Sequence, residues 1–298
     1  MNPYGYKAKT VSITHLPEVQ ESVGKLVRQG LINKKLHEKW HFYLKTNEIL
    51  PEAKTIIVVA MPQPVTRIWF KWQGTDFPAD IPPTYFAKAD DSRAEEILNN
   101  VLETAGYRIV KAQLALKTLA VRSGLAKYGR NNISYVPEMG SFCRLIAFYT
   151  DWQCKEDNWQ ESKVMKACEK CFLCRKNCPT GSITADRFLI HAEKCLTLSN
   201  EMEINFPKWI QPDWHNALIG CLHCQAVCPV GKPYLSKSAT GPTFSEEETR
   251  LILNNTPVEK LAHETKRKLD TMIHDEIFSV MVRNLGALIE KQKITTQR

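Results

Sequence analysis

The stretch CEKCFLCRKNCPTG, residues 168–181, decides the interpretation of this chain. It holds four cysteines in the pattern C-x2-C-x2-C-x3-C-P. A loop with this spacing can supply three thiolates to one cubane cluster, whereas the fourth cysteine of such a run binds the other cluster in two-cluster ferredoxins. The stretch therefore predicts a 4Fe–4S cluster that needs a further ligand from elsewhere in the chain.

A second, shorter motif supplies the missing thiols. C-x2-C-x3-C-P occurs at residues 221–229, and the lone Cys195 stands between the two motifs. The crossing rule assigns Cys168, Cys171, Cys174 and Cys228 to the first cluster, and Cys178, Cys195, Cys221 and Cys224 to the second. Eight cysteines thus fill eight positions. The prolines at 179 and 229 fix the backbone and end each ligand loop.

Other uses of clustered cysteines account for less of the pattern. Two C-x2-C pairs can form a tetrahedral zinc site, but zinc does not explain the three-cysteine run with its terminal proline. Disulfides are rare in a reducing compartment. The remaining two cysteines, Cys143 and Cys154, lie outside the motifs and are expected to be small buried hydrophobic residues.

Bulk properties favour a cytoplasmic protein of 298 residues with no membrane segment. The N-terminus lacks the apolar region of an export signal, and TIIVVAM at 55–61 is too short to span a bilayer. The formal net charge is +8. It would fall to roughly +4 if two oxidised cluster sites carried about −2 each, so the charge favours a solvated Lys/Arg surface over nucleic-acid binding.

Periodicity predicts alternating helices and strands over residues 1–151, which is an α/β domain. The expected helices are 17–46, 91–106 and 113–122, the last ending at Ser123-Gly124; the expected strands are 55–61 and 107–110, with a hairpin of 133–136 and 143–150. The proline-rich segment 62–84 is expected to be irregular.

The rest of the chain is expected to form two further parts. Residues 152–237 hold the cysteines and predict a two-cluster ferredoxin-like α+β domain. Residues 238–244 read as a linker, and the short C-terminal segment 238–298 as a helical tail.

Several motifs together resemble the epoxyqueuosine reductase family and, more distantly, the cobalamin-binding region of reductive dehalogenases. They are SGLAKYGRNN at 123–132, MGS at 139–141 and FYTD at 148–151, followed by the cysteine pattern with its lone Cys195. The resemblance runs from about residue 49 to residue 290.

This resemblance implies a nitroreductase-like α/β domain that holds base-off cobalamin close to one cluster. A low-potential donor of the ferredoxin or flavodoxin type would supply electrons through both clusters to cobalt, which would reduce a tRNA or a small-molecule substrate. The resemblance leaves open whether the chain is a monomer or a dimer. The residues that it places around the corrin are Gly124, Arg130, Asn131, Asn132, Gly140 and Ser141.

The sequence departs from the family at the proton donor. The family carries an acidic residue in an Asp-Ser-Ala-Pro context, where this chain has Val110-Lys111-Ala112-Gln113. Candidates for a replacement acid are Tyr85, Tyr128, Asp90 and Lys111, the lysine only if burial lowers its pKa. The expected function is therefore an epoxyqueuosine-reductase-like oxidoreductase whose substrate is not fixed by the sequence.

Two other readings stay open. The chain could be an electron-transfer or activase iron–sulfur protein that serves a partner's corrinoid or flavin and binds none itself. It could also be an iron–sulfur RNA-binding protein without catalysis, for which the basic run HETKRKLD at 263–270 gives the only local support.

Overall fold

The structure, a computed structural model, describes residues 4–40, 50–85, 91–202, 205–272 and 278–296. Its contacts divide the chain into two compact units, whose bounds differ from the predicted boundaries at 151 and 237. Unit 1 comprises Met1–Pro62, Ala89–Phe172 and Ile183–Glu193; unit 2 comprises Gln63–Lys88, Leu173–Ser182 and Lys194–Arg298. None of the helices in the described ranges has the length and apolarity needed to cross a bilayer.

Unit 1 is built on a four-stranded sheet in which every neighbouring pair is antiparallel. The strands are β1 (Lys7–Ser12), β2 (Thr55–Pro62), β5 (Ile109–Ala112) and β8 (Cys143–Thr150), in the order β1-β2-β8-β5. Strand β2 is buried from Thr55 to Met61. The apolar run TIIVVAM therefore forms the buried strand that the sequence predicts.

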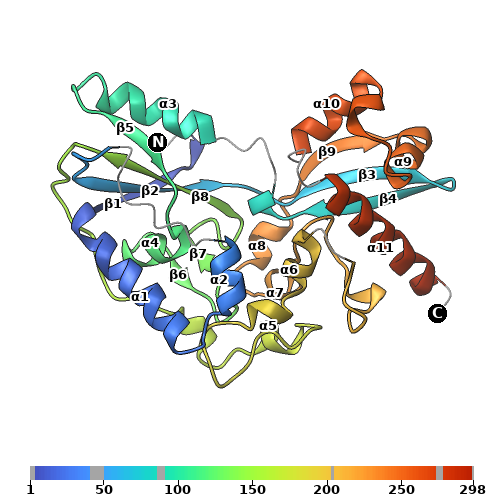
Figure 1. Ribbon diagram of the computed structural model, residues 1–298, viewed down its shortest axis with the longest axis horizontal. Coiled ribbons are helices and arrows are strands. Elements are labelled where there is room, and N and C mark those ends of the chain that lie inside the picture. The colour runs from blue at the N-terminus through green and yellow to red at the C-terminus, as the bar shows by residue number, and fades with distance from the viewer. Residues whose placement is uncertain (1–3, 41–49, 86–90, 203–204, 273–277, 297–298) are drawn as a thin grey trace. The chain divides into compact units, whose positions relative to one another are not determined.

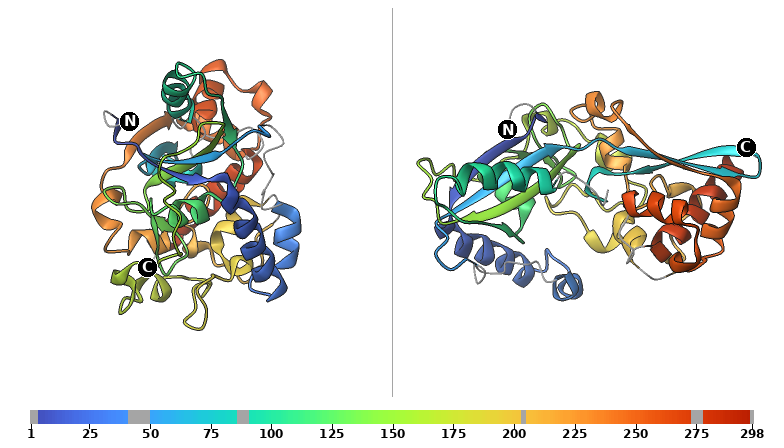
Figure 2. Two further views of the ribbon diagram at one scale, coloured as in Figure 1. Left: turned by 90° about the vertical axis from the view of Figure 1, so that its left-hand side faces the viewer. Right: turned by 90° about the horizontal axis from the view of Figure 1, so that it is seen from above.

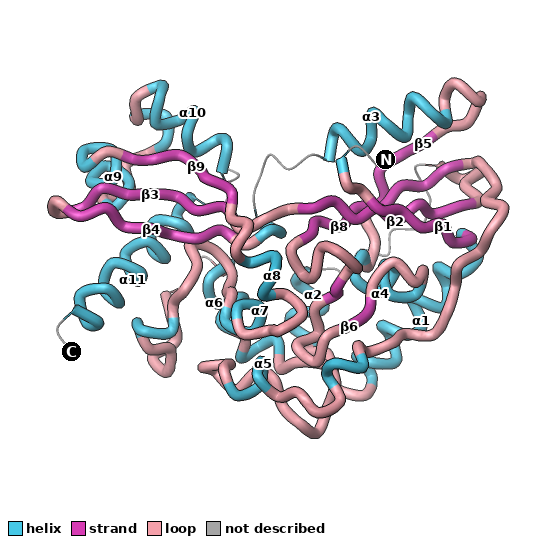
Figure 3. Tube along the Cα trace, turned by 180° about the vertical axis from the view of Figure 1, so that it is seen from behind, coloured by secondary structure: helices cyan, strands magenta, loops and turns pink. Residues whose placement is uncertain are grey.

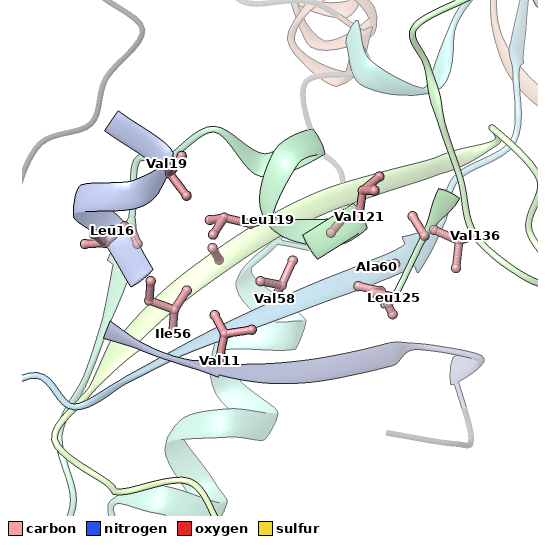
Figure 4. Close-up of a cluster of buried hydrophobic side chains, with 14 of the residues drawn as sticks. Val11, Leu16, Val19, Ile56, Val58, Ala60, Leu119, Val121, Leu125 and Val136 are labelled. Carbon is pink, nitrogen blue, oxygen red and sulfur yellow. The ribbon is translucent and has the colours of Figure 1, made fainter. Parts of the chain in front are cut away.

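Helices cover both faces of this sheet (Figure 1). Alternate residues of β2 point to opposite faces, as strand geometry requires. Ile56 and Val58 belong to the core beneath α1 (Leu16–Arg28) and α4 (Leu116–Arg122), which Figure 4 shows in close-up. Ile57 and Val59 belong to a second core beneath α3 (Asp91–Leu102). Both faces of β2 are therefore packed.

Glycines mark where two helices of unit 1 end. Helix α4 stops at Arg122, and Gly124 adopts a φ of +74°, as the Ser123-Gly124 pair predicts. The predicted single helix over 17–46 is wrong, because α1 ends at Arg28 and Gly30 has a φ of +68°. Helix α2 (Lys34–Trp40) then begins after Asn33, whose Oδ1 accepts the N–H of Leu36 at 3.2 Å.

The predicted hairpin between 133–136 and 143–150 is also wrong. Strand β7 (Ser134–Tyr135) pairs with β6 (Lys127–Tyr128), whereas β8 lies between β2 and β5. The N–H of Gly140 donates to the Val136 carbonyl at 2.9 Å. This tight turn closes before β8 begins, so β8 is free to enter the main sheet.

Unit 2 contains a three-stranded sheet in two segments that the sequence did not predict as strands. Strand β3 (Thr66–Trp72) pairs with β4 (Thr75–Ile81) and, in parallel, with β9 (Ala239–Phe244). The expectations of an irregular segment at 62–84 and a linker at 238–244 are therefore wrong. Pro78 is accommodated because β4 is an edge strand of this sheet, where a missing N–H breaks no ladder bond.

The C-terminal helices are part of the core of unit 2. They are α9 (Glu246–Leu253), α10 (His263–Met272) and α11 (Phe278–Thr296), and they pack around the β3–β4 hairpin and β9 (Figure 2, right). Phe70 and Phe244 stack with ring centroids 4.9 Å apart, and Leu285 is fully buried. The helical character of the tail is as predicted, but its residues share one core with the sheet.

Loops dominate the cysteine-bearing part of unit 2 (Figure 3). Its helices are short: α5 (Leu173–Lys176), α6 (Leu196–Glu201), α7 (His223–Ala226) and α8 (Lys232–Leu235). A chain that turns this often exposes backbone N–H groups, which are suitable donors to anionic sulfur.

Candidate iron–sulfur centre

The two cysteine motifs have the same local structure within unit 2. Cys174 lies in α5 and Cys224 in α7, each a single helical turn. After each turn the N–H of the cysteine before proline bonds a carbonyl three residues back: Cys178 to Arg175 (3.4 Å) and Cys228 to Gln225 (3.1 Å). The side chain of Asn177 joins the two loops by donating to the His223 carbonyl at 3.1 Å. The cysteine spacing that the two motifs share therefore corresponds to a loop structure that they also share.

Three predicted ligands of the second cluster come together in unit 2. Burial raises the pKa of the Cys221 thiol to about 12, and the nearby Cys195 and Cys178 thiols act in the same direction. Burial likewise raises the pKa of Cys195, where Cys178 again contributes. Such mutual electrostatic effects place the three thiols in the same region of unit 2.

The surroundings of these sulfurs fit a cluster. The backbone N–H and the hydroxyl of Thr197 both bond Cys195, and the backbone N–H of His223 bonds Cys221. In each case the N–H comes from the residue two positions after the cysteine. Hydrogen bonds to sulfur and partial burial are the means by which proteins tune iron–sulfur clusters, so the donor set suits thiolate ligands.

The ligands assigned to the first cluster are divided between the units. Cys168 and Cys171 belong to unit 1, and Cys174 and Cys228 to unit 2. Their assignment stays a prediction. Among the described residues, no three His, Cys, Asp or Glu side chains are grouped to hold a metal ion.

Tyr85 lies beside the second-cluster cysteines. It follows β4 in unit 2, and its phenol donates to Oε1 of Glu201. Burial raises the pKa of Tyr85 well above its usual value, and the charges of Glu201, Cys195 and Cys221 reinforce the rise. The phenol proton is therefore held firmly by Glu201, and the role of Tyr85 as a proton donor to substrate stays a prediction.

The other candidate acids differ in their surroundings. Tyr128 is buried in unit 1, where its phenol oxygen lies 3.3 Å from Oγ1 of Thr118 and burial raises its pKa. The side chain of Lys111 is 48% exposed and pairs with Asp91 at 2.6 Å, so it is not the buried lysine that a role as acid calls for. Asp90 lies outside the described residues.

Val110 is the residue that the motif resemblance predicts at the position of the family's acid. It lies on β5 opposite Tyr149 and packs against the core beneath α1 and α4. The side chain is a packing residue, and no proton can come from this position.

The residues predicted to surround a corrin are all in unit 1, and two of them, Arg130 and Asn131, have side chains bonded to their own chain. Arg130 donates to the Cys168 carbonyl at 2.7 Å and lies over the Phe172 ring. Asn131 is buried and donates to the Tyr135 hydroxyl at 2.9 Å. Asn132 has a φ of 59° in the same turn. The side chains of Arg130 and Asn131 thus hold the loop and the first cysteine of the motif.

Ser141 is the exception. It is buried, and its Oγ has no hydrogen-bond partner among the residues that the structure describes. Gly140, beside it, and Gly124 both adopt positive φ angles, of 60° and 74°. An unsatisfied buried hydroxyl next to a backbone turn without a side chain is what a polar macrocycle substituent would need. To this extent the residues fit a corrinoid.

A cavity of about 410 Å³ also lies in unit 1 beside Cys168. Arg130, Arg187 and Phe188 contribute to its lining. It adjoins the loop that Arg130 holds, so the guanidinium faces both the cysteine backbone and the cavity.

Sequence reasoning missed two polar residues that bond the segments around the cysteines proposed for the second cluster. Glu201, which bonds Tyr85, and Asn284, which is fully buried in α11, gave no motif. The one available signal was position: Asn284 falls on the apolar stripe formed by Val280, Met281 and Leu288. A polar residue within such a stripe is expected to have buried partners.

Exchange of Lys111 for methionine tests how much this lysine contributes to the stability of the fold. We expect a loss of at most about 1 kcal/mol in unfolding free energy, because the Lys111 side chain is about half exposed and Asp91 keeps its bonds to Arg144. Arg144→Met should cost more, roughly 1–3 kcal/mol, because Arg144 is half-buried and bonds both oxygens of Asp91. Urea unfolding at pH 7 measures both.

The stability difference between wild type and Arg144→Met is expected to depend on pH. Burial acts to raise the pKa of Asp91, but bonds from Arg144 and Lys111 outweigh it and leave the pKa lowered. Stability from a lowered carboxyl pKa is present above the unfolded value near pH 4 and lost as pH falls through the folded value. The difference between wild type and Arg144→Met should therefore shrink in acid; a difference that persists at pH 2 would contradict this.

Comparison with known protein families shows which class of iron–sulfur protein the cysteine segment resembles. Residues 167–231 match the family described as 4Fe-4S double cluster binding domain. The match includes all eight predicted ligand cysteines and confirms the prediction of a double-cluster iron–sulfur segment.

The relatives are epoxyqueuosine reductases. That of Escherichia coli (strain K12) is 31% identical over 119 residues, which cover 40% of this chain and 30% of the relative. That of Shewanella oneidensis is 26% identical over 148 residues, covering 49% and 36%. The chain thus matches about a third of the length of these curated relatives.

Solved structures of the same enzymes share the fold. The epoxyqueuosine reductase of Streptococcus thermophilus has a TM-score of 0.64 at 17% identity, over 98% of this chain and 81% of that chain. An epoxyqueuosine reductase with a tRNA-Tyr epoxyqueuosine-modified stem loop has a TM-score of 0.67 at 17% identity, over 96% and 78%. The resemblance predicted from the motifs is confirmed: the chain is similar to epoxyqueuosine reductases in fold and, over less than half of its length, in sequence.

Proposed function

We propose that this chain is a reductase that passes electrons through two 4Fe–4S clusters to a bound cobalamin, which reduces a substrate. The observation that carries the proposal is that Cys178, Cys195 and Cys221 lie in one region of unit 2, with backbone N–H donors to the sulfurs of Cys195 and Cys221. The double-cluster match supports the iron–sulfur part, and the relatives support the reductase part.

The chain's own residues prepare the second cluster. The thiolates of Cys178, Cys195, Cys221 and Cys224 are its proposed ligands. Donors from Thr197 and His223 stabilise negative charge on sulfur, and partial burial keeps water away. Together these set the potential at which the cluster accepts an electron.

Unit 1 carries the proposed corrinoid-binding residues. Ser141 would offer its free hydroxyl, and the turns at Gly124 and Gly140 would let the backbone approach the macrocycle. Arg130 would keep the loop of Cys168 in place through the carbonyl bond. A bound cobalamin would supply a strongly reducing cobalt centre.

The substrate is proposed from the relatives' names. They are epoxyqueuosine reductases, and one solved neighbour holds a tRNA stem loop. Another, from Bacillus subtilis, is described with a catalytic aspartate loop swung out of the active site. The motif resemblance implies that Val110 stands in this chain where the family carries its acid. We therefore propose that a different group delivers the proton. Tyr128 is the first to test, because it shares unit 1 with the proposed corrinoid residues.

Anaerobic reconstitution with iron, sulfide and hydroxocobalamin tests the proposal. After gel filtration we expect two clusters and a retained corrinoid with a base-off cob(II)alamin signal in electron spin resonance. Loss of all corrinoid in the column would contradict the cobalamin reductase and favour an electron carrier for a partner protein. Turnover is then assayed first with tRNA that carries epoxyqueuosine.

Exchange of Ser141 for valine sharpens this test. Removing the hydroxyl should weaken corrinoid retention by about tenfold, the worth of one hydrogen bond of roughly 1.4 kcal/mol. Ser134→Val, at another buried serine of unit 1, is the matched control and should retain the corrinoid. Equal retention by both variants would remove Ser141 from the binding site.

A further inference from the structure

Asn284 of helix α11 is a fully buried amide with two strong bonds. Its exposed fraction is 0%, and Nδ2 donates to the Asn200 carbonyl at 2.8 Å and to the Leu218 carbonyl at 2.9 Å. Both N–H groups of the amide are thereby used. A single side chain thus joins α11 to two other segments.

These two segments carry predicted ligands of the second cluster. Asn200 lies in α6, whose N-cap residue is Cys195. Leu218 stands three residues before Cys221. The side chain of Asn200 completes a triangle by donating to the Gly220 carbonyl at 2.7 Å, directly before Cys221. The network therefore connects the Cys195 segment to the Cys221 segment.

Neighbouring residues of α11 hold the same two segments. Arg283 donates to the carbonyls of Ser199 (2.8 Å) and Met202 (2.6 Å), at the end of α6. Lys291 donates to the His215 carbonyl at 2.7 Å, where the Cys221 segment begins. The bonds from one helix therefore reach both ligand segments.

The second cluster has special need of such support. Its predicted ligands include only two closely spaced cysteines, Cys221 and Cys224, so Cys195 must be placed by tertiary contacts. Bonds between buried groups are strong and specific in geometry, because no water competes for them. Asn284, Asn200 and Leu218 are all fully buried.

We propose that Asn284 is a positioning residue of the second iron–sulfur cluster. It holds the Cys195 and Cys221 segments at the separation that a four-iron cluster requires. The inference rests on the proposed ligand assignment, and it gives the C-terminal helix a part in the electron-transfer site.

Three variants at one position test the inference after anaerobic reconstitution. Asn284→Leu keeps the volume but removes both donors. Asn284→Asp places a carboxylate against two carbonyl oxygens. We expect the spin-resonance signal of the second cluster to be shifted or lost in Asn284→Leu, and the effect to be larger in Asn284→Asp. The iron content should fall from about eight toward four per chain. Asn284→Gln, which keeps the donors on a longer stem, should recover part of the signal.

The control is Leu288→Ala on the same helix. Leu288 packs in the core of unit 2 and makes none of the network bonds, so this variant loses stability but should keep both cluster signals and their midpoint potentials. If Asn284 only fills space, Asn284→Leu will resemble the wild type and Leu288→Ala will be worse. That ranking would overturn the inference.

Two further measurements keep the outcomes distinct. Cys195→Ser is reconstituted alongside. If Cys195→Ser keeps both clusters, the ligand assignment is wrong. If Cys195→Ser loses one cluster but the cluster signals of Asn284→Leu equal those of the wild type, the positioning role of Asn284 is wrong. Should Asn284→Leu not fold, Arg283→Met leaves both donors of Asn284 in place and removes the bonds to the end of α6, together with the bonds to the Asn284 amide oxygen and the contact with the Phe206 ring. It should shift the second-cluster potential in the same direction by a smaller amount, and no shift would reject the proposal.

Discussion

Cys195→Ser is expected to leave the protein with one cluster instead of two. Cys195 lies with Cys178 and Cys221 and receives bonds from Thr197 that suit a thiolate. A serine hydroxyl ionises far less readily than a thiol and is a poor ligand for iron. Reconstituted protein should therefore fall from about eight to about four irons per chain, and its reduced spectrum should keep the signal of the other cluster.

Cys143→Ser is the control for this exchange. Cys143 is a buried free cysteine on β8 of unit 1, where burial raises its pKa to about 12. It meets the expectation of a small hydrophobic residue outside the motifs, and its exchange should leave the iron content unchanged. Equal iron in wild type and Cys195→Ser would show that the lone cysteine is not a ligand.

Gly220→Ala is expected to damage unit 2 through two effects. Gly220 has a φ of +70°, where an L-residue is strained by about 1–2 kcal/mol. A Cβ there would also lie 2.5 Å from the Tyr85 ring, so Tyr85 must move away from Glu201. Overpacking of this kind adds roughly 1–3 kcal/mol. The free energy of unfolding should fall by about 2–5 kcal/mol, and the signal of the cluster held by the adjacent Cys221 should change.

Gly181→Ala separates the two effects. Its φ is +64°, but nothing lies within 4 Å of a Cβ at this position, so only the backbone strain applies. Gly181→Ala should cost about 1–2 kcal/mol in urea unfolding and leave the spectra unaltered. Combining Gly220→Ala with Tyr85→Ala should cost less than the sum of the two single changes. If Gly220→Ala and Gly181→Ala lose the same free energy of unfolding, Tyr85 can move aside without cost.

Features encoded by neighbours in sequence were predictable. The cysteine spacing defined the ligand loops because a cluster loop is a local structure, and the repeated turns at Cys178 and Cys228 follow from it. The apolar run of β2 and the Gly124 stop of α4 were equally local. The likeness to epoxyqueuosine reductases rested on the same kind of short motif.

Features that depend on distant partners were not predictable in the same way. Pro78 argued against a strand, yet it is harmless at the edge of a sheet. The segment 239–244 looked like a linker because its strand partner, β3, lies more than 160 residues earlier. Asn284 showed only as a polar break in an apolar stripe, since the carbonyls that it bonds belong to residues 200 and 218. In each case the deciding contact is long-range.

The interleaving of the two units sets the order of events during synthesis. The chain passes between units at residues 62, 88, 172, 182 and 193, so neither is a continuous segment. The β3–β4 hairpin leaves the ribosome early, but its core partners Phe244 and Leu285 follow roughly 10–40 s later at usual translation rates of about 5–20 residues per second. Until then the hairpin has an uncovered apolar face, and the network that ties Cys195 to Cys221 lacks Asn284. We therefore expect the second cluster to mature after translation, and a ribosome-stalled chain that ends before α11 should acquire less iron than the released protein.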